Sequence, residues 1–329
     1  MGMNYPNRSA EEAARGGPLF VVLNAGSGHN NSDDEQLVMA RVFKNAGREF
    51  EFLKIEEPSQ IDLIARRAVE LAQTKCGVVV AAGGDGTINA VASAVLGSGC
   101  PFGVLPQGTF NYFGRAHAIP QDTQAAASAL LGASISPVQV GQVNGRLFLV
   151  NASVGLYPQL LENREAWKQQ FGRSRLVAFI SGLATILQAH KQLRLQIEST
   201  AQLAELPATI RTPTLFVGNN HLQLSRVGID EKHADAVSQG QLAGIVVRPI
   251  GTFALFGLLL RGLLGQLGEA ENIDSFSFRQ LTVMPKGHKR IKVATDGETI
   301  WMQTPLVFKV ASESLLLMVP APADRVEVA

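Results

Sequence analysis

A glycine-rich run with a single carboxylate lies in the first third of the chain. Residues 83–87 read Gly-Gly-Asp-Gly-Thr and follow the apolar segment 77–82. Glycine lacks Cβ and accepts positive φ, so its backbone N–H groups can approach a phosphate closely. Asp85 would repel a bare phosphate, which indicates a Mg²⁺ ion bound with a nucleotide. The run predicts a nucleotide-phosphate loop, and the alternative is a turn in which Asp85 caps a helix.

Two more polar loops with glycines follow apolar segments. Residues 24–28 read Asn-Ala-Gly-Ser-Gly after segment 19–23, and residues 106–111 read Pro-Gln-Gly-Thr-Phe-Asn after segment 102–105. Ligands of open α/β sheets gather at the carboxyl ends of the strands. Either loop alone fits an ordinary turn. Three such loops at successive strand ends favour one phosphate-binding edge.

Two carboxylates lie in a short turn near the C-terminus. Asp296 and Glu298 flank a glycine, between the basic segment 289–294 and the segment that begins at Thr299. Phosphoryl transfer to an alcohol needs a carboxylate that accepts the hydroxyl proton. Asp-Gly is also among the commonest hairpin turns, and the residues alone favour that interpretation.

The elements of the first third alternate in type. Apolar runs at 19–23, 50–55, 77–82 and 102–105 predict strands, and segments 32–47, 60–72 and 88–96 predict helices. This order is typical of a Rossmann-like domain with three layers, in which helices cover a parallel sheet. Residues 1–18 contain no apolar signal sequence, and we expect them to form a loose tail.

Near residue 138 the segments become shorter and β-rich. Asn144-Gly145 favours a type I′ hairpin turn. We expect a polar turn at 151–155 and helices at 176–189 and 252–267. Strands are predicted at 138–142, 147–150, 193–198, 208–218, 242–247, 275–284, 306–310 and 315–319. The sequence therefore predicts an α/β nucleotide-binding domain at 18–137 and a mostly antiparallel, β-rich substrate domain at 138–322.

Composition limits the partners and the compartment. The chain has 329 residues, 46% of them hydrophobic and 17% charged, with a net charge of +1, so we expect a folded protein without a nucleic-acid partner. Two cysteines without metal-ligand spacing suit a reducing, cytoplasmic compartment. Segment 250–267 is apolar, but its glycines and Arg261 favour a core-packed helix over an interfacial or transmembrane one. The basic cluster 286–292 is interpreted as a solvated strand face in preference to a site for ATP phosphates or anionic headgroups.

Together these motifs, with the Phe-Gly-Arg-Ala segment at 113–116, resemble the diacylglycerol kinase catalytic-domain family, which includes bacterial lipid kinases and is related to sphingosine and ceramide kinases. The resemblance implies a lipid kinase that uses ATP and Mg²⁺, with diacylglycerol as the default acceptor at a membrane surface. It also implies ATP in a cleft between two domains and a C-terminal segment that returns to the first domain. A peripheral location at the inner face of the membrane and a homodimer are left open.

The resemblance also implies roles for individual residues. Asp296 is expected to be the general base, Glu298 a supporting or alternative base, and Asp85 a metal ligand through MgATP. The residues expected to contact the nucleotide are Asn24, Gly83, Gly84, Asp85, Gly86, Thr87, Asn89, Thr109 and Asn111.

The chain departs from the family pattern at two positions. Tyr112 stands where the family usually has aspartate after the loop asparagine. Gln239-Gly240 stands where bacterial relatives often have an Asp-Gly pair linked to a structural Mg²⁺, so no second metal site is predicted. Two alternatives stay open: an NAD or sugar kinase that uses the same glycine loop, and a non-catalytic sensor of lipid or nucleotide.

Overall fold

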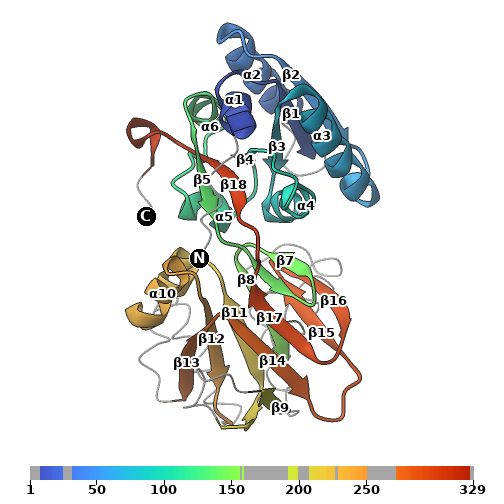
Figure 1. The fold of residues 1–329 in the computed structure, drawn as a ribbon, viewed down its shortest axis with the longest axis vertical. Coiled ribbons are helices and arrows are strands. Elements are labelled where there is room, and N and C mark those ends of the chain that lie inside the picture. The colour runs from blue at the N-terminus through green and yellow to red at the C-terminus, as the bar shows by residue number, and fades with distance from the viewer. Residues whose placement is uncertain are drawn as a thin grey trace, which may run out of the picture. The chain divides into compact units, whose positions relative to one another are not determined.

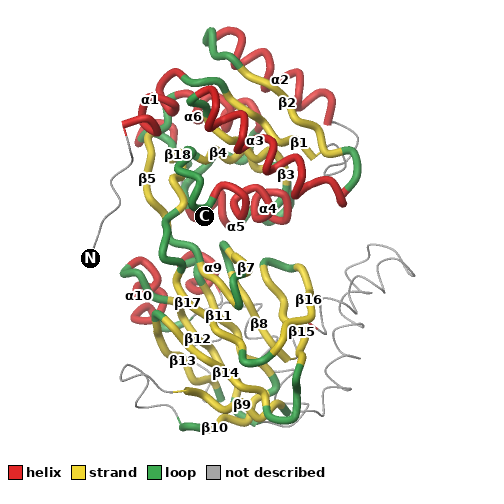
Figure 2. Tube along the Cα trace, turned by 45° about the vertical axis from the view of Figure 1, so that its right-hand side comes forward, coloured by secondary structure: helices red, strands yellow, loops and turns green. Residues whose placement is uncertain are grey.

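The chain divides into two compact units. Unit 1 comprises residues 1–140 and 311–329, and unit 2 comprises residues 141–310. The computed structural model describes residues 8–24, 32–155, 158, 192–198, 207–226, 229–249 and 272–326. Helices alternate with strands in unit 1, whereas strands dominate the described part of unit 2 (Figure 2).

A six-stranded sheet forms the centre of unit 1 (Figure 1). Its order is β2 (Phe50–Ile55), β1 (Leu19–Asn24), β3 (Val78–Gly83), β4 (Phe102–Pro106), β18 (Leu315–Val319) and β5 (Ser134–Val138). The pairings among β1 to β4 are parallel, and β18 is parallel to β4 but antiparallel to β5. All of β3 is buried, which explains its continuous apolar sequence.

Helices cover both faces of this sheet. α2 (Ser32–Asn45) packs against α6 (Thr123–Leu131), and α3 (Ile61–Lys75) packs against α4 (Asp85–Val95). The apolar residues of α3 at helical spacing are buried: Ala65, Ala68, Val69 and Ala72. The predicted Rossmann-like domain is therefore confirmed. The short elements of the unit are η1 (Pro58–Gln60), α5 (Tyr112–Ala116) and η4 (Pro322–Asp324).

The prediction of a loose N-terminal tail is wrong for its second half, which forms α1 (Arg8–Gly16). Ala10, Ala13 and Ala14 are buried along this helix. The guanidinium of Arg48 donates hydrogen bonds to the carbonyl oxygens of Ala13 and Ala14, each at 2.9 Å, and so satisfies the helix C-terminus. Because Arg48 is distant in sequence, local patterns gave no sign of this cap.

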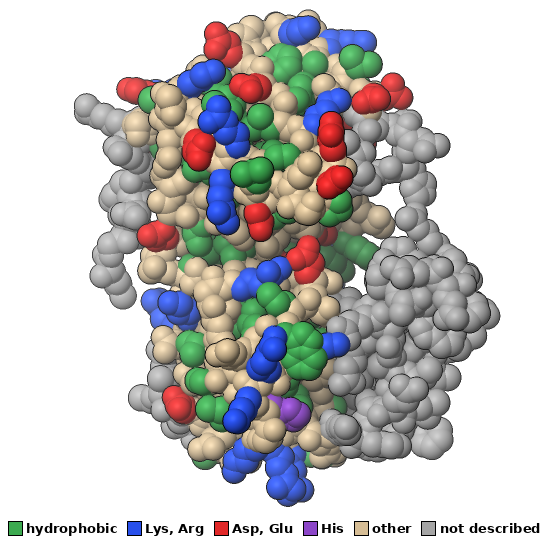
Figure 3. Space-filling view, turned by 90° about the vertical axis from the view of Figure 1, so that its right-hand side faces the viewer, with side chains coloured by type: hydrophobic (Ala, Val, Ile, Leu, Met, Phe, Trp, Pro, Cys, Tyr) green, Lys and Arg blue, Asp and Glu red, His purple; other side chains and the backbone are tan. Residues whose placement is uncertain are grey.

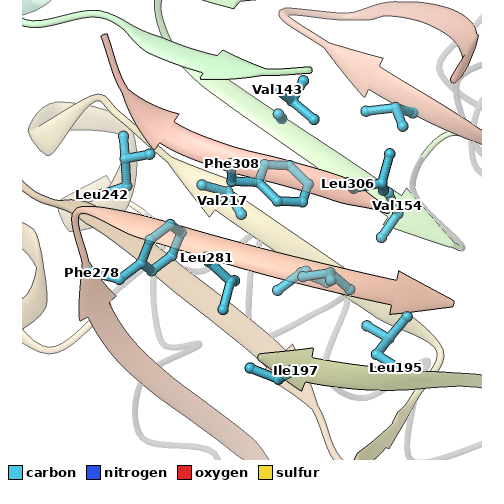
Figure 4. Close-up of a cluster of buried hydrophobic side chains, with 14 of the residues drawn as sticks. Val143, Val154, Leu195, Ile197, Val217, Leu242, Phe278, Leu281, Leu306 and Phe308 are labelled. Carbon is cyan, nitrogen blue, oxygen red and sulfur yellow. The ribbon is translucent and has the colours of Figure 1, made fainter. Parts of the chain in front are cut away.

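Two six-stranded antiparallel sheets account for the strands in the described part of unit 2. The order in one is β10 (Thr209–Thr212), β9 (Leu193–Glu198), β14 (Gln280–Pro285), β17 (Leu306–Val310), β6 (Gly141–Val143) and β7 (Arg146–Phe148). The order in the other is β13 (Ile273–Phe278), β12 (Leu242–Val247), β11 (Thr214–Gly218), β8 (Asn151–Gly155), β15 (Arg290–Thr295) and β16 (Glu298–Gln303). Side chains from both sheets meet in one core, with Val143 and Phe308 from the first and Val154 and Val217 from the second (Figure 4).

Three predictions in unit 2 need correction. Segments 208–218 and 275–284 each contain two strands in different sheets, because the chain crosses between the sheets at Pro213 and Arg279. Pro213 has no N–H for a ladder, which suits such a corner. The buried positions shift by one residue at each corner, from Thr212 to Leu215 and from Phe278 to Leu281, and the prediction of continuous strands overlooked this shift. Residues 151–155 are the central strand β8 and not a turn.

Two helices, α9 (His221–Arg226) and α10 (Glu231–Ser238), pack near β12 around a small core that includes Leu224, Ala234 and Ile245. The predicted helices at 176–189 and 252–267 lie outside the described residues. Among the helices that the structure describes, none combines the length and apolar character needed to cross a membrane.

Candidate active site

Three loops of unit 1 start at one edge of its sheet. β1, β3 and β4 are parallel neighbours, and the register pairs Leu23 with Ala82 and Gly83 with Pro106. From β1 the chain continues to β2 on one side, and β3 and β4 lie on the other side of β1, so the order of the strands changes direction between β1 and β3. Open α/β sheets bind ligands in the crevice at this kind of switch point.

The glycine loop turns directly into α4. Gly84 is extended, with φ −83° and ψ 179°, and Asp85 begins the helix. A Cβ on Gly83 would lie 2.7 Å from Oγ1 and 2.8 Å from Cβ of Thr87, so only glycine fits there. The first turn of a helix presents N–H groups that the helix does not pair and carries the positive end of its dipole. The loop therefore has the form of an anion site.

The buried Thr87 links the glycine loop to the end of β1. Its side chain is 4% exposed, and its Oγ1 accepts a hydrogen bond of 3.1 Å from Nδ2 of Asn24. Residues 25–28 of the first loop lie outside the described residues. The structure thus brings Asn24 and the glycine loop together, at the point where β1 and β3 end.

Asn111 organises the third loop. It adopts the left-handed conformation, with φ 48° and ψ 42°, which asparagine tolerates better than most residues. Its Oδ1 accepts from the Gly108 N–H at 2.9 Å, and its Nδ2 donates to the Gly108 carbonyl and to Oε1 of Gln121, both at 2.8 Å. Asn111 is 3% exposed, so its amide supports the loop from within.

The second and third loops are joined directly. The backbone N–H of Asn111 donates to Oδ2 of Asp85 at 3.0 Å, and the Gln107 N–H donates to the Gly83 carbonyl at 2.9 Å. A Cβ on Gly108 would lie 2.9 Å from Cα of Gly84, so the two backbones could not approach with a larger residue there. Asp85 therefore holds the third loop in place, a role that its sequence position did not reveal.

Two aromatic rings lie beside this edge. Phe110 and Tyr112 stack with their ring planes 3° apart and their centroids 5.9 Å apart, and Phe110 is 52% exposed. Tyr112 therefore places a stacked ring where the family usually has a carboxylate. Thr109 is exposed, and Asn89 is partly buried in α4.

His117 follows α5 and contributes no charge to this edge at neutral pH. Its ring lies against Phe113 in an edge-to-face contact with a centroid distance of 4.8 Å. Burial lowers the pKa of His117 to about 4. The imidazole is therefore uncharged at pH 7.

The Asp-Gly-Glu turn of unit 2 holds a carboxylate surrounded by N–H donors. Asp296 and Gly297 have φ values of 47° and 89°, as a type I′ turn requires, and they join β15 to β16. The carboxylate of Asp296 accepts backbone hydrogen bonds from Leu149 at 2.7 Å and from Val150 and Asn151 at 2.9 Å each. These donors fix the position of the carboxylate and stabilise its ionised form.

Arg146, which the sequence did not single out, pairs with Glu298. Its Nη2 donates to Oε2 of Glu298 at 2.8 Å, and its Nε donates to Oγ1 of Thr295 at 3.0 Å. The Glu298 side chain is 62% exposed. Arg146 and Glu298 are 152 residues apart, so no local signal could have connected them.

Amide side chains surround the segment at the start of β8. The register pairs Asn151 with Gly218 and Ala152 with Thr295, so the residues that follow β11 and β15 flank Asn151. Nδ2 of Asn219 donates to the Leu149 carbonyl at 3.0 Å, and Nδ2 of Asn151 donates to Oε1 of Gln223 at 3.1 Å. Oδ1 of Asn151 and Oγ of Ser153 are buried and have no hydrogen-bond partner in the part of the chain that the structure describes.

Within the described ranges, no three His, Cys, Asp or Glu residues gather as metal ligands would. Gln239 caps the C-terminus of α10, and Gly240 follows it with φ 82°. His221 pairs with Asp235 at 3.2 Å, and Nδ1 of His233 lies 2.8 Å from Oγ of Ser277. These histidines have local partners, which gives them a structural explanation.

The loop motifs of unit 1 match a known protein family. Residues 18–143, which contain all three loops, match the diacylglycerol kinase catalytic domain. The match therefore covers β1 to β4 and their loops, and it ends before the Asp296 turn.

Several bacterial proteins are similar to this chain. "Probable lipid kinase YegS-like" from Pseudomonas aeruginosa is 35% identical over 52% of this chain and 55% of its own length. Diacylglycerol kinase of Staphylococcus aureus strain MRSA252 is 28% identical over 80% of this chain and 84% of its own length. Diacylglycerol kinase of Bacillus subtilis is 41% identical over 28% of this chain and 32% of its own length. The chain thus spans about half, 55%, of the length of the YegS-like relative.

The fold recurs in a solved structure of a diacylglycerol kinase from Bacillus anthracis strain Sterne. The TM-score is 0.66, and the likeness covers 93% of this chain and 97% of that one at 18% sequence identity. At this identity the likeness concerns the fold. It extends through both units, beyond the residues of the catalytic domain match.

Proposed function

We propose that this protein is a kinase that transfers the γ-phosphate of ATP to the hydroxyl of a lipid, with diacylglycerol as the default acceptor. The observation that carries the proposal is the joined pair of loops at the switch point of unit 1. The Asn111 N–H binds Asp85, and Gly84 passes close to Gly108, within residues that match the diacylglycerol kinase catalytic domain.

The residues at this edge fit MgATP. A side chain at Gly83 would meet Thr87 and one at Gly108 would meet the Gly84 backbone, and the start of α4 offers N–H groups to phosphate oxygens. We assign Asp85 as the oxygen ligand that meets Mg²⁺ on the nucleotide. Bound MgATP supplies the γ-phosphoryl group and neutralises its charge. The proposed nucleotide contacts are Asn24, Gly83, Gly84, Asp85, Gly86, Thr87, Asn89, Thr109 and Asn111.

The proposed proton acceptor is in unit 2. The Asp296 carboxylate, held by three backbone N–H groups, takes the proton of the lipid hydroxyl, whose oxygen forms the new bond to phosphorus as the bond to ADP breaks. Glu298 is the supporting or alternative base, and Arg146 orients it. Because the donors also order segment 149–151, Asp296 combines a positioning role with the proposed chemical one.

We infer that the acceptor is met at the inner face of a membrane by a cytoplasmic protein that does not bind nucleic acid. A lipid with a long acyl chain stays in the bilayer, so its kinase has to reach the membrane surface. A homodimer is compatible with the proposal but is not required by it.

The decisive experiment is phosphate transfer from radiolabelled MgATP to dispersed diacylglycerol, sphingosine, ceramide and phosphatidylglycerol, with NAD and a hexose as soluble acceptors. We expect transfer to a lipid, and diacylglycerol first. Transfer to NAD or to the hexose alone would show that the protein is a kinase for a soluble substrate. Tight ATP binding without transfer to any acceptor would assign a sensor.

Two variants divide the roles in unit 2. Asp296→Asn is expected to abolish transfer and to retain ATP binding, because the nucleotide contacts lie in unit 1. Glu298→Gln is expected to lower kcat less. Loss of ATP binding together with transfer in Asp296→Asn, at unchanged thermal stability, would contradict the assigned role.

A further inference from the structure

The outward side of the β15–β16 hairpin combines an exposed tryptophan with cations. Trp301 lies directly opposite Lys292, and its side chain is 54% exposed. Nζ of Lys292 is 5.2 Å from the centroid of the Trp301 ring, and Cζ of Arg290 is 5.8 Å from it. Such distances allow cation–π attraction. We call this surface the basic hairpin face and define it by its members: Lys286, His288, Lys289, Arg290, Lys292 and Trp301.

The charged residues of the hairpin segment before Asp296 are all basic. Between residues 275 and 295 the sequence contains no aspartate or glutamate, and Lys286, Lys289 and Arg290 are exposed. The next acidic residues are engaged elsewhere, Asp296 with backbone N–H groups and Glu298 with Arg146. Figure 3, which turns β15 and β16 toward the viewer, shows Lys and Arg side chains gathered around an exposed hydrophobic ring.

Folding alone does not account for the exposed Trp301 ring. The inward side chains of the hairpin, Ile291, Val293 and Met302, already fill the core with exposures of 7%, 0% and 7%. β16 is the edge strand of its sheet, so among the described strands only β15 pairs with it. An amphipathic indole flanked by Lys and Arg matches the chemistry of a membrane–water interface.

We propose that the basic hairpin face docks on a bilayer that contains anionic phospholipids, with Trp301 at headgroup depth and the Lys and Arg side chains on lipid phosphates. The choice of a membrane as partner rests on the proposed lipid kinase, but the docking itself needs neither ATP nor phosphoryl transfer. A nucleic acid fits less well, because the basic residues form one local cluster in a chain whose net charge is only +1.

Tryptophan fluorescence can test the depth of Trp301. The chain has two tryptophans, so Trp167→Phe leaves Trp301 as the only one. We expect this variant to bind vesicles of phosphatidylcholine with phosphatidylglycerol, with a blue shift in emission, and to bind pure phosphatidylcholine vesicles weakly. Higher salt should release it. Equal binding to both vesicles, or binding without a shift, would overturn the proposal.

Charge variants locate the surface in a vesicle co-sedimentation assay. Each basic residue near an anionic surface contributes roughly fivefold in binding, so Arg290→Gln with Lys292→Gln should weaken binding by about 30-fold. Trp301→Ala should weaken it as well. The matched control, Arg41→Gln with Lys44→Gln on α2, removes the same charge and should bind as the parent does. An equal loss in the control, or none in the hairpin variant, would overturn the proposal.

Activity assays separate this inference from the proposed function. The hairpin variants should keep phosphate transfer to detergent-dispersed diacylglycerol and lose it on anionic vesicles. Hairpin-dependent vesicle binding without transfer to any acceptor would support the docking surface and refute the kinase. Transfer to dispersed lipid without vesicle binding would refute the docking surface alone. Binding of an RNA oligonucleotide that the hairpin variant loses equally would also refute docking specific to a membrane.

Discussion

In unit 1 the polar residues follow directly on parallel strands, whereas in unit 2 they come from antiparallel strands that are distant in the sequence. The Asp85 to Asn111 hydrogen bond spans 26 residues, and the bonds from segment 149–151 to Asp296 span 145 to 147. Glycines allow the close backbone approach in unit 1, and a buried network of donors fixes a carboxylate in unit 2. The glycine loop can therefore be encoded locally, while the Asp296 turn depends on the completed sheet.

The strongest way to break this comparison is to remove the Asp296 carboxylate. Asp296→Ala leaves three backbone N–H groups without their acceptor, so we expect the free energy of unfolding to fall by about 3 kcal/mol. Asp296→Asn keeps one oxygen acceptor and should cost less. Urea unfolding of the full chain measures both changes. Equal stability of Asp296→Ala and the parent would show that segment 149–151 does not depend on this carboxylate.

The corresponding change in unit 1 is Asn111→Ala. It removes the side-chain hydrogen bonds to Gly108 and Gln121 and places alanine at positive φ, so we expect a loss of about 2–3 kcal/mol. Asn111→Gly relieves the backbone strain and isolates the hydrogen bonds. The thermal stability and the ATP affinity of Asn111→Ala should fall together. If a destabilised variant kept the ATP affinity of the parent, this loop would not be part of the nucleotide site.

The pH dependence of stability should report on His117 of unit 1. Its pKa of about 4 in the fold lies below the ordinary value, so the unfolded chain binds the proton more readily. Stability should therefore fall as the pH drops from about 6.5 to 4. Because the side chain retains some solvent contact, we expect the free energy of unfolding to fall by only about 1–2 kcal/mol over this range. His117→Phe should unfold with less pH dependence in this range, and an unchanged dependence would contradict the assignment.

The exposed Arg146–Glu298 pair should matter little for stability. An ion pair of this kind contributes about 0.5 kcal/mol, so Glu298→Gln and Arg146→Gln should each unfold close to the parent. In transfer assays both should lower kcat, with Glu298→Gln the more severe. If Arg146→Gln lost activity and Glu298→Gln did not, Arg146 would act through another partner.

The smallest effect is expected at Ser153. Its buried hydroxyl has no hydrogen-bond partner among the described residues, so Ser153→Ala should leave stability unchanged or raise it by less than about 0.5 kcal/mol. Asn151→Ala also removes an unpaired oxygen, but it breaks the bond to Gln223 and should destabilise. A clear loss of stability in Ser153→Ala would show that the hydroxyl has a partner, such as a bound water molecule.

Sequence patterns recovered much of the architecture, and their failures have a common cause. The strands and helices of unit 1 were found because their apolar periodicity is continuous and glycines or polar turns mark their ends. The corners at Pro213 and Arg279 were missed because the apolar composition continues while the alternation shifts by only one residue where the chain changes sheets. The helix α1 was missed because Arg48, which caps it, is remote in sequence.

By itself, the sequence determined the Rossmann-like sheet, the glycine loop and the Asp-Gly turn, since each depends on local backbone preferences. Only the tertiary structure decided that Asp85 supports the third loop, that three N–H groups hold Asp296 and that Arg146 pairs with Glu298. Only the tertiary structure also placed two cations close to the exposed Trp301 ring, Lys292 at 5.2 Å and Arg290 at 5.8 Å from its centroid. The physical reason is that hydrogen bonds and ion pairs between distant residues depend on strand register, which the completed fold sets.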